Sequence, residues 1–131
     1  MGIVFYHCPV CGNVIIKAVD GGPVPHCCGS EMEELVPHRE EKMKEKHLPV
    51  VEKCHDHSYI VKVGAEPHPM TPEHWINFIC VETMDGFCLH WLFPDEEPKS
   101  EFKCEDKPVA IYEYCSVHGL WMTDCSKNCK L

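Results

Sequence analysis

PVAIYEYCSVHGLWM, residues 108–122, is typical of two β-strands joined by a tight turn. Apolar, β-branched and aromatic residues dominate 108–115, and a second apolar run begins at Gly119. The segment between them carries Cys115 and, three residues later, His118, a spacing at which a thiolate and an imidazole can bind one metal ion. The stretch therefore predicts an antiparallel strand pair, 108–115 and 119–122, with part of a metal site at its turn.

Five more strands are expected upstream, at residues 50–54, 59–63, 75–82, 87–92 and 101–104. Turn-forming residues separate the strands at 54–58, 84–86 and 94–98. Seven short strands at this spacing predict an immunoglobulin-like antiparallel β-sandwich. Cys80, Trp91 and Cys115 imitate the Cys-Trp-Cys pattern of immunoglobulin domains. We expect no disulfide there, because Cys115 is better used as a metal ligand.

Three further histidines belong with the Cys115 turn. His68 lies between two prolines, which restrict the backbone of the loop that carries its ring. TPEH at 71–74 is typical of a helix N-cap followed by a proline and one short turn, which would present His74. His47 directly precedes the first expected strand of the sandwich. Imidazole and thiolate are ligands for transition metals, so the sequence predicts one mononuclear metal site from His47, His68, His74, Cys115 and His118.

A second set of candidate ligands lies near the amino terminus, in CPVCG at 8–12 and CCG at 27–29. A Cys-x2-Cys-Gly knuckle points backbone amides at its sulfurs, and its glycine permits the turn. Four cysteines in this arrangement favour zinc, whereas the adjacent pair at 27 and 28 departs from the repeated spacing of zinc ribbons. The predicted ligands of this second metal are Cys8, Cys11, Cys27 and Cys28.

The chain of 131 residues has room for one ordinary domain and a small one. We expect a metal-knuckle domain at 1–37 and a β-sandwich domain at 38–131, with a charged, solvated linker at 38–44. A segment of about 36 residues buries too little apolar surface to fold alone, so a bound metal should stabilise it.

Composition restricts the partners and the compartment. The net charge of −9 argues against nucleic acid as a partner, and no apolar stretch is as long as a membrane span. Eleven cysteines form an odd number, and the amino terminus has no signal-peptide pattern, so we expect reduced thiols and a cytoplasmic location. Five lysines nonetheless lie around His47: Lys42, Lys44, Lys46, Lys53 and Lys62.

The remaining cysteines have simpler interpretations. Cys125 and Cys129 near the carboxyl end are expected to be two free thiols, although a metal clip or a redox pair is also open. The other four are expected to be small buried hydrophobic residues: Cys54, Cys80, Cys88 and Cys104.

Three segments of the chain together resemble the superoxide reductases of the desulfoferrodoxin and neelaredoxin family: EKHLPVVEK at 45–53, HPMTPEHWI at 68–76 and YCSVHGLW at 114–121. With the amino-terminal cysteines, which are similar to a desulforedoxin module, the resemblance runs from about residue 5 to residue 122. It implies a small desulforedoxin-like or rubredoxin-like knuckle followed by the sandwich. It also implies two iron ions per chain and a homodimer.

The resemblance implies a role for each candidate. His47, His68, His74 and His118 would surround ferrous iron, with the Cys115 thiolate opposite an open position for superoxide. Superoxide would take one electron and leave as hydrogen peroxide, and a donor such as rubredoxin would reduce the iron again. Lys46 would attract superoxide, and Glu45 would bind ferric iron after peroxide leaves.

Two other functions fit parts of the pattern. Cys115, His118 and Met122 imitate the ligand loop of a cupredoxin, a copper protein that carries electrons without catalysis. That interpretation leaves three histidines unexplained. A purely structural zinc protein does not explain Glu45, Lys46 and His47.

Overall fold

The computed structural model describes residues 2–40, 46–55, 57–103 and 107–125, without the side chains of 53–55. Two compact units make up the chain, Met1–Val36 and Pro37–Leu131. Each has its own sheets and its own buried residues, so each is described by itself.

The first unit is a small β-structure built around cysteines. β1 (Phe5–His7) pairs antiparallel with β2 (Val14–Ile16) and β5 (Glu33–Leu35), while β3 (His26–Cys27) and β4 (Ser30–Glu31) form a short hairpin. Tyr6, Cys8 and Met32 are buried together. Such a core is too small to stabilise a fold by burial alone.

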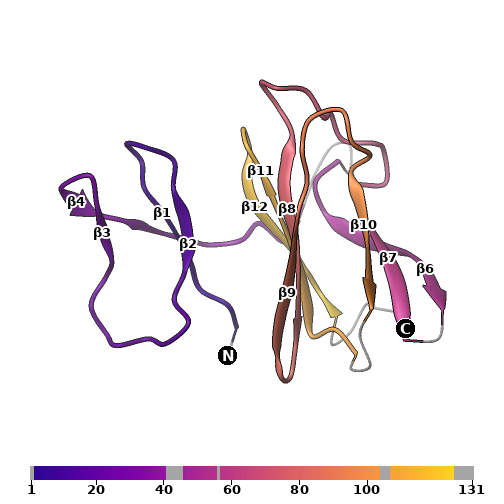
Figure 1. Cartoon of the computed structure of the whole chain (residues 1–131), viewed down its shortest axis with the longest axis horizontal. Helices are drawn as coiled ribbons and strands as arrows, with labels where there is room; N and C mark the ends of the chain where they lie inside the picture. Colours follow the sequence, from indigo (N-terminus) through magenta and orange to yellow (C-terminus); the bar gives the residue numbers. More distant parts are fainter. Residues whose placement is uncertain (1, 41–45, 56, 104–106, 126–131) are drawn as a thin grey trace. The chain divides into compact units, whose positions relative to one another are not determined.

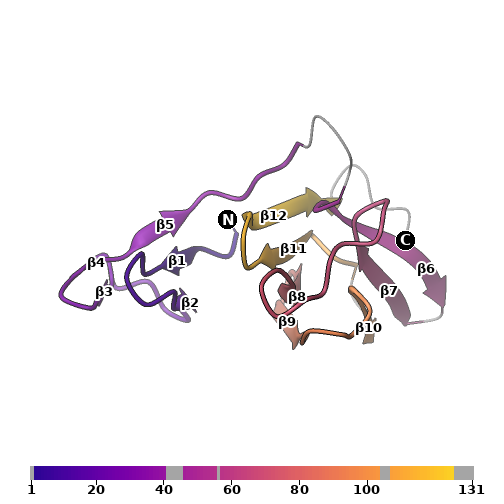
Figure 2. The ribbon, with the colours of Figure 1, turned by 90° about the horizontal axis from the view of Figure 1, so that it is seen from above.

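All seven strands expected in the second unit are present. They are β6 (Pro49–His55), β7 (Ser58–Val63), β8 (Ile76–Thr83), β9 (Gly86–Trp91), β10 (Lys99–Lys103), β11 (Ala110–Cys115) and β12 (Gly119–Asp124). They form two antiparallel sheets, with strand orders β10-β7-β6 and β12-β11-β8-β9. The two sheets lie face to face as a β-sandwich, as Figures 1 and 2 show.

Alternating side chains from both sheets fill the space between the two layers. Val61 and Val63 of β7 meet Ile79 and Val81 of β8 and Ile111 of β11 in one buried cluster. Cys80 and Cys115 are both buried and carry free thiols, so the expected absence of an immunoglobulin-type disulfide is confirmed.

One expectation about a loop is wrong. Thr71–His74 forms a tight turn closed by an isolated β-bridge instead of a helical turn, and the Thr71 hydroxyl accepts a hydrogen bond from the His74 amide at 3.2 Å. The first residue of the expected linker, His38, is exposed and is also hydrogen-bonded to the sandwich. His38 forms a parallel bridge with Trp121, because its amide donates to Leu120 and its carbonyl accepts from Met122.

Two expectations about cysteines are also wrong. Cys88 is exposed, because its side chain lies on β9 at the edge of its sheet. Cys125 is buried and disulfide-bonded. Cys80 is buried as expected. The side chains of Cys54, Cys104 and Cys129 lie outside the described part of the chain.

Within the described residues, the structure contains no helix with the length and apolar character needed to cross a membrane.

One glycine fixes the approach of two loops. Gly64 follows β7 with a φ of 81°, and its amide donates to Leu48 at 3.0 Å. A Cβ at this position would lie 2.5 Å from the carbonyl oxygen of Lys46. Only glycine therefore lets the loop after β7 contact the segment that precedes β6.

We predict that Gly64→Ala destabilises the second unit by about 1–3 kcal/mol from backbone strain, with a further loss from the clash. Urea unfolding of the full chain measures the change. Gly86→Ala is the matched control, since Gly86 also has a positive φ but has open space around its Cβ position. Equal losses in the two variants would contradict the proposed close approach.

Candidate metal centres

The sandwich topology gathers the five predicted ligands at one end. His47 precedes β6, His68 and His74 lie between β7 and β8, and the other two lie at the end of β11 and in the β11–β12 turn. Antiparallel pairing places the start of β6, the end of β7 and the start of β8 at this same end. Ligands separated by up to 71 residues in the sequence thus meet in space.

The four imidazole rings form a closed ring of neighbours. Centroids of adjacent rings are 4.8 Å apart for His47 and His68, 4.7 Å for His68 and His74, 5.1 Å for His74 and His118, and 4.8 Å for His118 and His47. Adjacent rings are inclined by 67–85°. Nitrogen Nε2 of His47 lies 3.1 Å from Nδ1 of His118. This arrangement brings several ring nitrogens toward one point.

Cys115 brings its sulfur to the same point from the protein interior. Its Sγ atom is 3.2 Å from Nε2 of His74 and 3.8 Å from Nδ1 of His118. The backbone amide of His118 also donates to this sulfur at 3.4 Å. Burial raises the pKa of the Cys115 thiol, and Glu113 adds to this, whereas the amides of His118 and Val117 oppose it. A bound cation would favour the thiolate.

His68 provides a test of whether a metal fits. Its Nδ1 atom lies 2.7 Å from the carbonyl oxygen of Pro69, so Nδ1 carries the proton and Nε2 carries the lone pair. That Nε2 atom is buried and has no hydrogen-bond partner among the described residues. Burial lowers the pKa of His68 to about 4, so the ring is neutral at pH 7. A neutral imidazole with a buried, unused lone pair fits a metal ligand.

The donor set as a whole also fits a transition metal. Atoms of His47, His74, Cys115 and His118 all lie within 4.8 Å of one another, and His68 adjoins this group through its ring contacts. Imidazoles with one thiolate suit iron, copper or zinc better than magnesium or calcium.

A β-bulge and a tight turn place the last two donors. The register between β8 and β11 shifts between Tyr114 and Cys115, where Asn77 is the extra residue. The shift lets both Cys115 and Ile76 face the core. Gly119, at a φ of 83°, then closes the turn that carries His118.

Of the two charged residues expected beside the site, the structure describes one. Lys46 is half-buried and precedes the candidate ligand His47. Burial lowers the pKa of His74, and the positive charge of Lys46 contributes in the same direction, which places this lysine near the site. Glu45 lies outside the described residues, as do Lys42 and Lys44.

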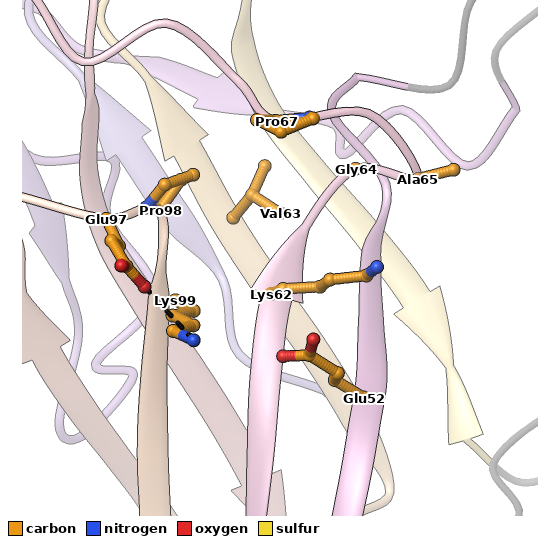
Figure 3. Close-up of a pocket in the computed structure, with 9 residues that line it drawn as sticks. All are labelled: Glu52, Lys62, Val63, Gly64, Ala65, Pro67, Glu97, Pro98 and Lys99. Atoms are coloured by element: carbon orange, nitrogen blue, oxygen red, sulfur yellow. Dashed lines mark ion pairs between the residues drawn. The ribbon is translucent and has the colours of Figure 1, made fainter.

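A separate cavity of about 370 Å³ lies against the outer residues of the β7 and β10 sheet. Figure 3 shows Gly64, Ala65 and Pro67 on the loop beside it. Lys62 and Lys99 are register partners on neighbouring strands and line this cavity, with Glu97 paired to Lys99 at 3.0 Å. Lys62 is thus part of this cavity, which contains none of the predicted metal ligands.

The amino-terminal cysteines form a second cluster. The ligand atoms of Cys8, Cys11, Cys27 and Cys28 all lie within 4.8 Å of one another. Cys11 donates its amide to the Cys8 sulfur at 3.5 Å, as expected for a knuckle. Cys28 has a φ of 53°, a left-handed conformation that is uncommon for a residue other than glycine. The two adjacent cysteines therefore both place their thiols in the cluster, at a cost in backbone strain.

Four thiols at this distance cannot all ionise without a cation. The Cys11 backbone amide lowers the pKa of Cys8 to about 6. Hydrogen bonding to Cys11 and then to Cys27 raises the pKa of Cys28 to about 12. A divalent or trivalent metal would remove this conflict, since it stabilises all four thiolates at once.

Two residues next to the clusters were not recognised from the sequence. Trp121 stacks on the His47 ring at 4.6 Å, and the motif YCSVHGLW contained it without a role. Asn13 donates its side-chain amide to the Cys27 sulfur at 3.6 Å. No pattern in a single sequence indicates that Trp121 or Asn13 makes such a contact.

The chain is similar to known proteins over most of its length. Residues 39–124 match the family model described as Desulfoferrodoxin. A desulfoferrodoxin homolog of Archaeoglobus fulgidus is 39% identical over 120 residues, covering 90% of this chain and 94% of the relative. A desulfoferrodoxin of Desulfarculus baarsii is 38% identical, covering 91% and 94%.

A solved structure matches the fold. The superoxide reductase from Treponema pallidum superposes with a TM-score of 0.80 at 30% identity, covering 94% of this chain and 98% of that chain. The family model covers most of the chain, and the relatives span both units. The chain therefore belongs to the desulfoferrodoxin family.

Proposed function

We propose that this protein is a superoxide reductase. The observation that carries the proposal is the ring of four imidazoles with the buried Cys115 sulfur beside it. Four histidines and one cysteine would hold a mononuclear iron: His47, His68, His74, His118 and Cys115. Similarity to proteins named superoxide reductase supports the assignment of the substrate.

Iron bound there would supply the single electron that superoxide needs, and a thiolate ligand favours that donation by increasing electron density on the metal. Superoxide, one electron and two protons give hydrogen peroxide. The exposed ring of His118 and the half-buried ring of His74 leave the site open to a small anion. An external one-electron donor must then restore the electron.

Lys46 is proposed to capture the substrate. Its ammonium group carries a positive charge beside the ligand cluster, in a chain whose net charge is −9. A local cation attracts superoxide despite the unfavourable overall field, and it orders water that can deliver protons. Glu45 is proposed to bind the ferric iron after peroxide leaves. Its adjacency in sequence to Lys46 is the support for this role.

The second centre is proposed to be an iron tetrathiolate held by Cys8, Cys11, Cys27 and Cys28. The adjacent pair and the strained Cys28 backbone depart from the relaxed geometry of a zinc ribbon. The chain would then bind two iron ions. We also propose a cytoplasmic homodimer that receives electrons from a donor such as rubredoxin, because its family resemblance and its many reduced thiols suit that setting.

The geometry disfavours the cupredoxin alternative. Met122 pairs with Tyr112 across β12 and β11, and it lies one residue away from Trp121, which stacks on His47. Successive residues of a strand face opposite sides of a sheet, so Met122 lies on the opposite face of this sheet from Trp121 and Cys115. It cannot serve as the axial ligand of a copper site there.

Metal analysis with an activity assay tests the function. Protein purified without added metal should contain about two iron ions per chain and should consume superoxide with a stoichiometric yield of peroxide and without evolving oxygen. Copper near one per chain, zinc alone, or oxygen evolution would contradict the assignment.

The sulfur of Cys115 gives a sharper test. Serine has the shape of cysteine without its soft thiolate, so we predict that Cys115→Ser binds iron poorly at the sandwich site or holds it without activity. Iron content and superoxide consumption measure the loss. Cys80→Ser is the matched control, since Cys80 is equally buried in a neighbouring strand. Full iron and normal turnover in Cys115→Ser would exclude the thiolate mechanism.

The role of Lys46 predicts a specific salt dependence. A charge about 5 Å from superoxide contributes roughly 3 kcal/mol at an effective dielectric of about 20, before screening. We therefore expect Lys46→Ala to slow capture by about ten-fold or more, with a weaker response to ionic strength, and Lys46→Arg to retain most of the rate. Stopped-flow mixing or pulse radiolysis of the reduced protein measures capture.

Lys103→Ala is the control for that measurement. It removes the same charge at the end of the sandwich remote from the candidate metal site. Lys103 pairs there with Ser58 at the start of β7. An equal effect of the two substitutions would show that net charge, and not a local cation, governs capture.

A further inference from the structure

A stack of aromatic rings leads from the surface to one ligand of the sandwich site. The rings of His38 and Trp121 have centroids 4.6 Å apart at an angle of 38°. Trp121 in turn lies 4.6 Å from the His47 ring, at only 13°. His38 is exposed, Trp121 is half-buried and His47 is buried. The three rings therefore cross from solvent to the metal ligands without a gap.

Backbone hydrogen bonds hold this stack in place. The amide of His38 donates to the carbonyl of Leu120, and its own carbonyl accepts from the Met122 amide, both at 2.9 Å. His38 thus lies beside β12 like a short additional strand. Trp121 also donates its indole Nε1–H to the carbonyl oxygen of His118 at 3.2 Å. One indole therefore contacts two ligand residues, His47 through its ring and His118 through its backbone.

We propose that His38, Trp121 and His47 form the route by which an electron enters the sandwich iron site, an inference that rests on the proposed function. The partner is a one-electron protein donor with a redox centre near its surface, and it docks where His38 is exposed. The donor loses one electron and the ferric iron gains it. No bond forms or breaks, and no proton moves. Rings in van der Waals contact suit this step, because electron transfer weakens steeply across gaps between groups.

The exposed ring of His118 offers the competing entry point. A protein docked there would cover the open side of the site, which superoxide needs. At His47, by contrast, the indole of Trp121 already covers one face of the ring. A partner that docks at His38 leaves the exposed ring of His118 uncovered. Separate positions for donor and substrate allow reduction and capture to alternate without release of the donor.

Replacement of the rings tests the route in the iron-loaded full chain. Reduced rubredoxin is the protein donor, and ascorbate is the small-molecule comparison. We expect Trp121→Leu and His38→Ala to slow reduction by rubredoxin by about ten-fold, a change of about 1.4 kcal/mol in the barrier, while superoxide capture and reduction by ascorbate stay normal. Trp121→Phe retains a stacked ring and should retain most of the rate.

Trp91→Leu is the matched control. Trp91 is 74% exposed on β9, at the opposite edge of the sheet from β12. If Trp121→Leu loses iron, the reduction rate of His38→Ala decides whether the route exists, since His38 lies one ring further from the ligands. Reduction of His38→Ala at the wild-type rate would overturn the route.

Docking is measured separately, without superoxide or turnover. Zinc-loaded, ¹⁵N-labelled protein is titrated with zinc-substituted rubredoxin, and the NMR shifts are mapped on the sequence. Shifts centred on residues 38 and 120–121 support the route, and shifts centred on 117–118 overturn it. Failure of the wild-type protein to consume superoxide would instead reject the proposed function, while this docking measurement would still decide the surface.

Discussion

The buried lone pair on Nε2 of His68, which has no partner among the described residues, is the constraint on which the candidate metal site depends. A buried nitrogen acceptor without a partner costs free energy, and three other imidazoles and the buried thiol of Cys115 lie around it. Without a cation, the arrangement is unfavourable for its polar atoms. A bound metal would use the lone pair of His68 Nε2. The loops at this end are thus shaped for coordination more than for packing.

The same reasoning applies to the cysteine cluster, but the consequence differs. The sandwich has a large apolar core in which most residues are not candidate ligands, although Cys115 is one of its members. We therefore expect its fold to depend less on a bound metal. In the described part of the first unit, Tyr6, Cys8 and Met32 form one small buried cluster, and Cys8 is itself a ligand candidate. Its folding and its metal binding are therefore expected to be one process.

Much of the architecture could be predicted from local pattern. Period-two alternation and turn residues located all seven sandwich strands, since both signals depend on neighbours in the sequence. The prediction of a helical turn at Thr71–His74 was wrong because the same residues suit both a helix N-cap and a tight turn. The β-bridge that closes the turn decides between the two. The prediction that Cys88 is buried was wrong because burial depends on which strand lies at the edge of a sheet, and the sequence does not show this order.

The candidate ligands were predictable by residue type, yet their mutual distances were not. His47 and His118 are 71 residues apart in the sequence, and only the pairing order of the strands brings them together. Trp121 illustrates the limit. Its contact with His47 depends on tertiary packing, so nothing in its own neighbourhood distinguishes it from an ordinary strand tryptophan.

The bridge between His38 and Trp121 also bears on where the sandwich unit begins. The family match starts at residue 39, whereas the structural unit starts at Pro37. A fragment cut at the family boundary would lose the backbone groups that His38 pairs with β12 and the ring that covers the indole. Of the two residues in between, His38 belongs to the sandwich by hydrogen bonding, although the sequence there resembles a tether. A minimal working version of this unit should therefore carry them.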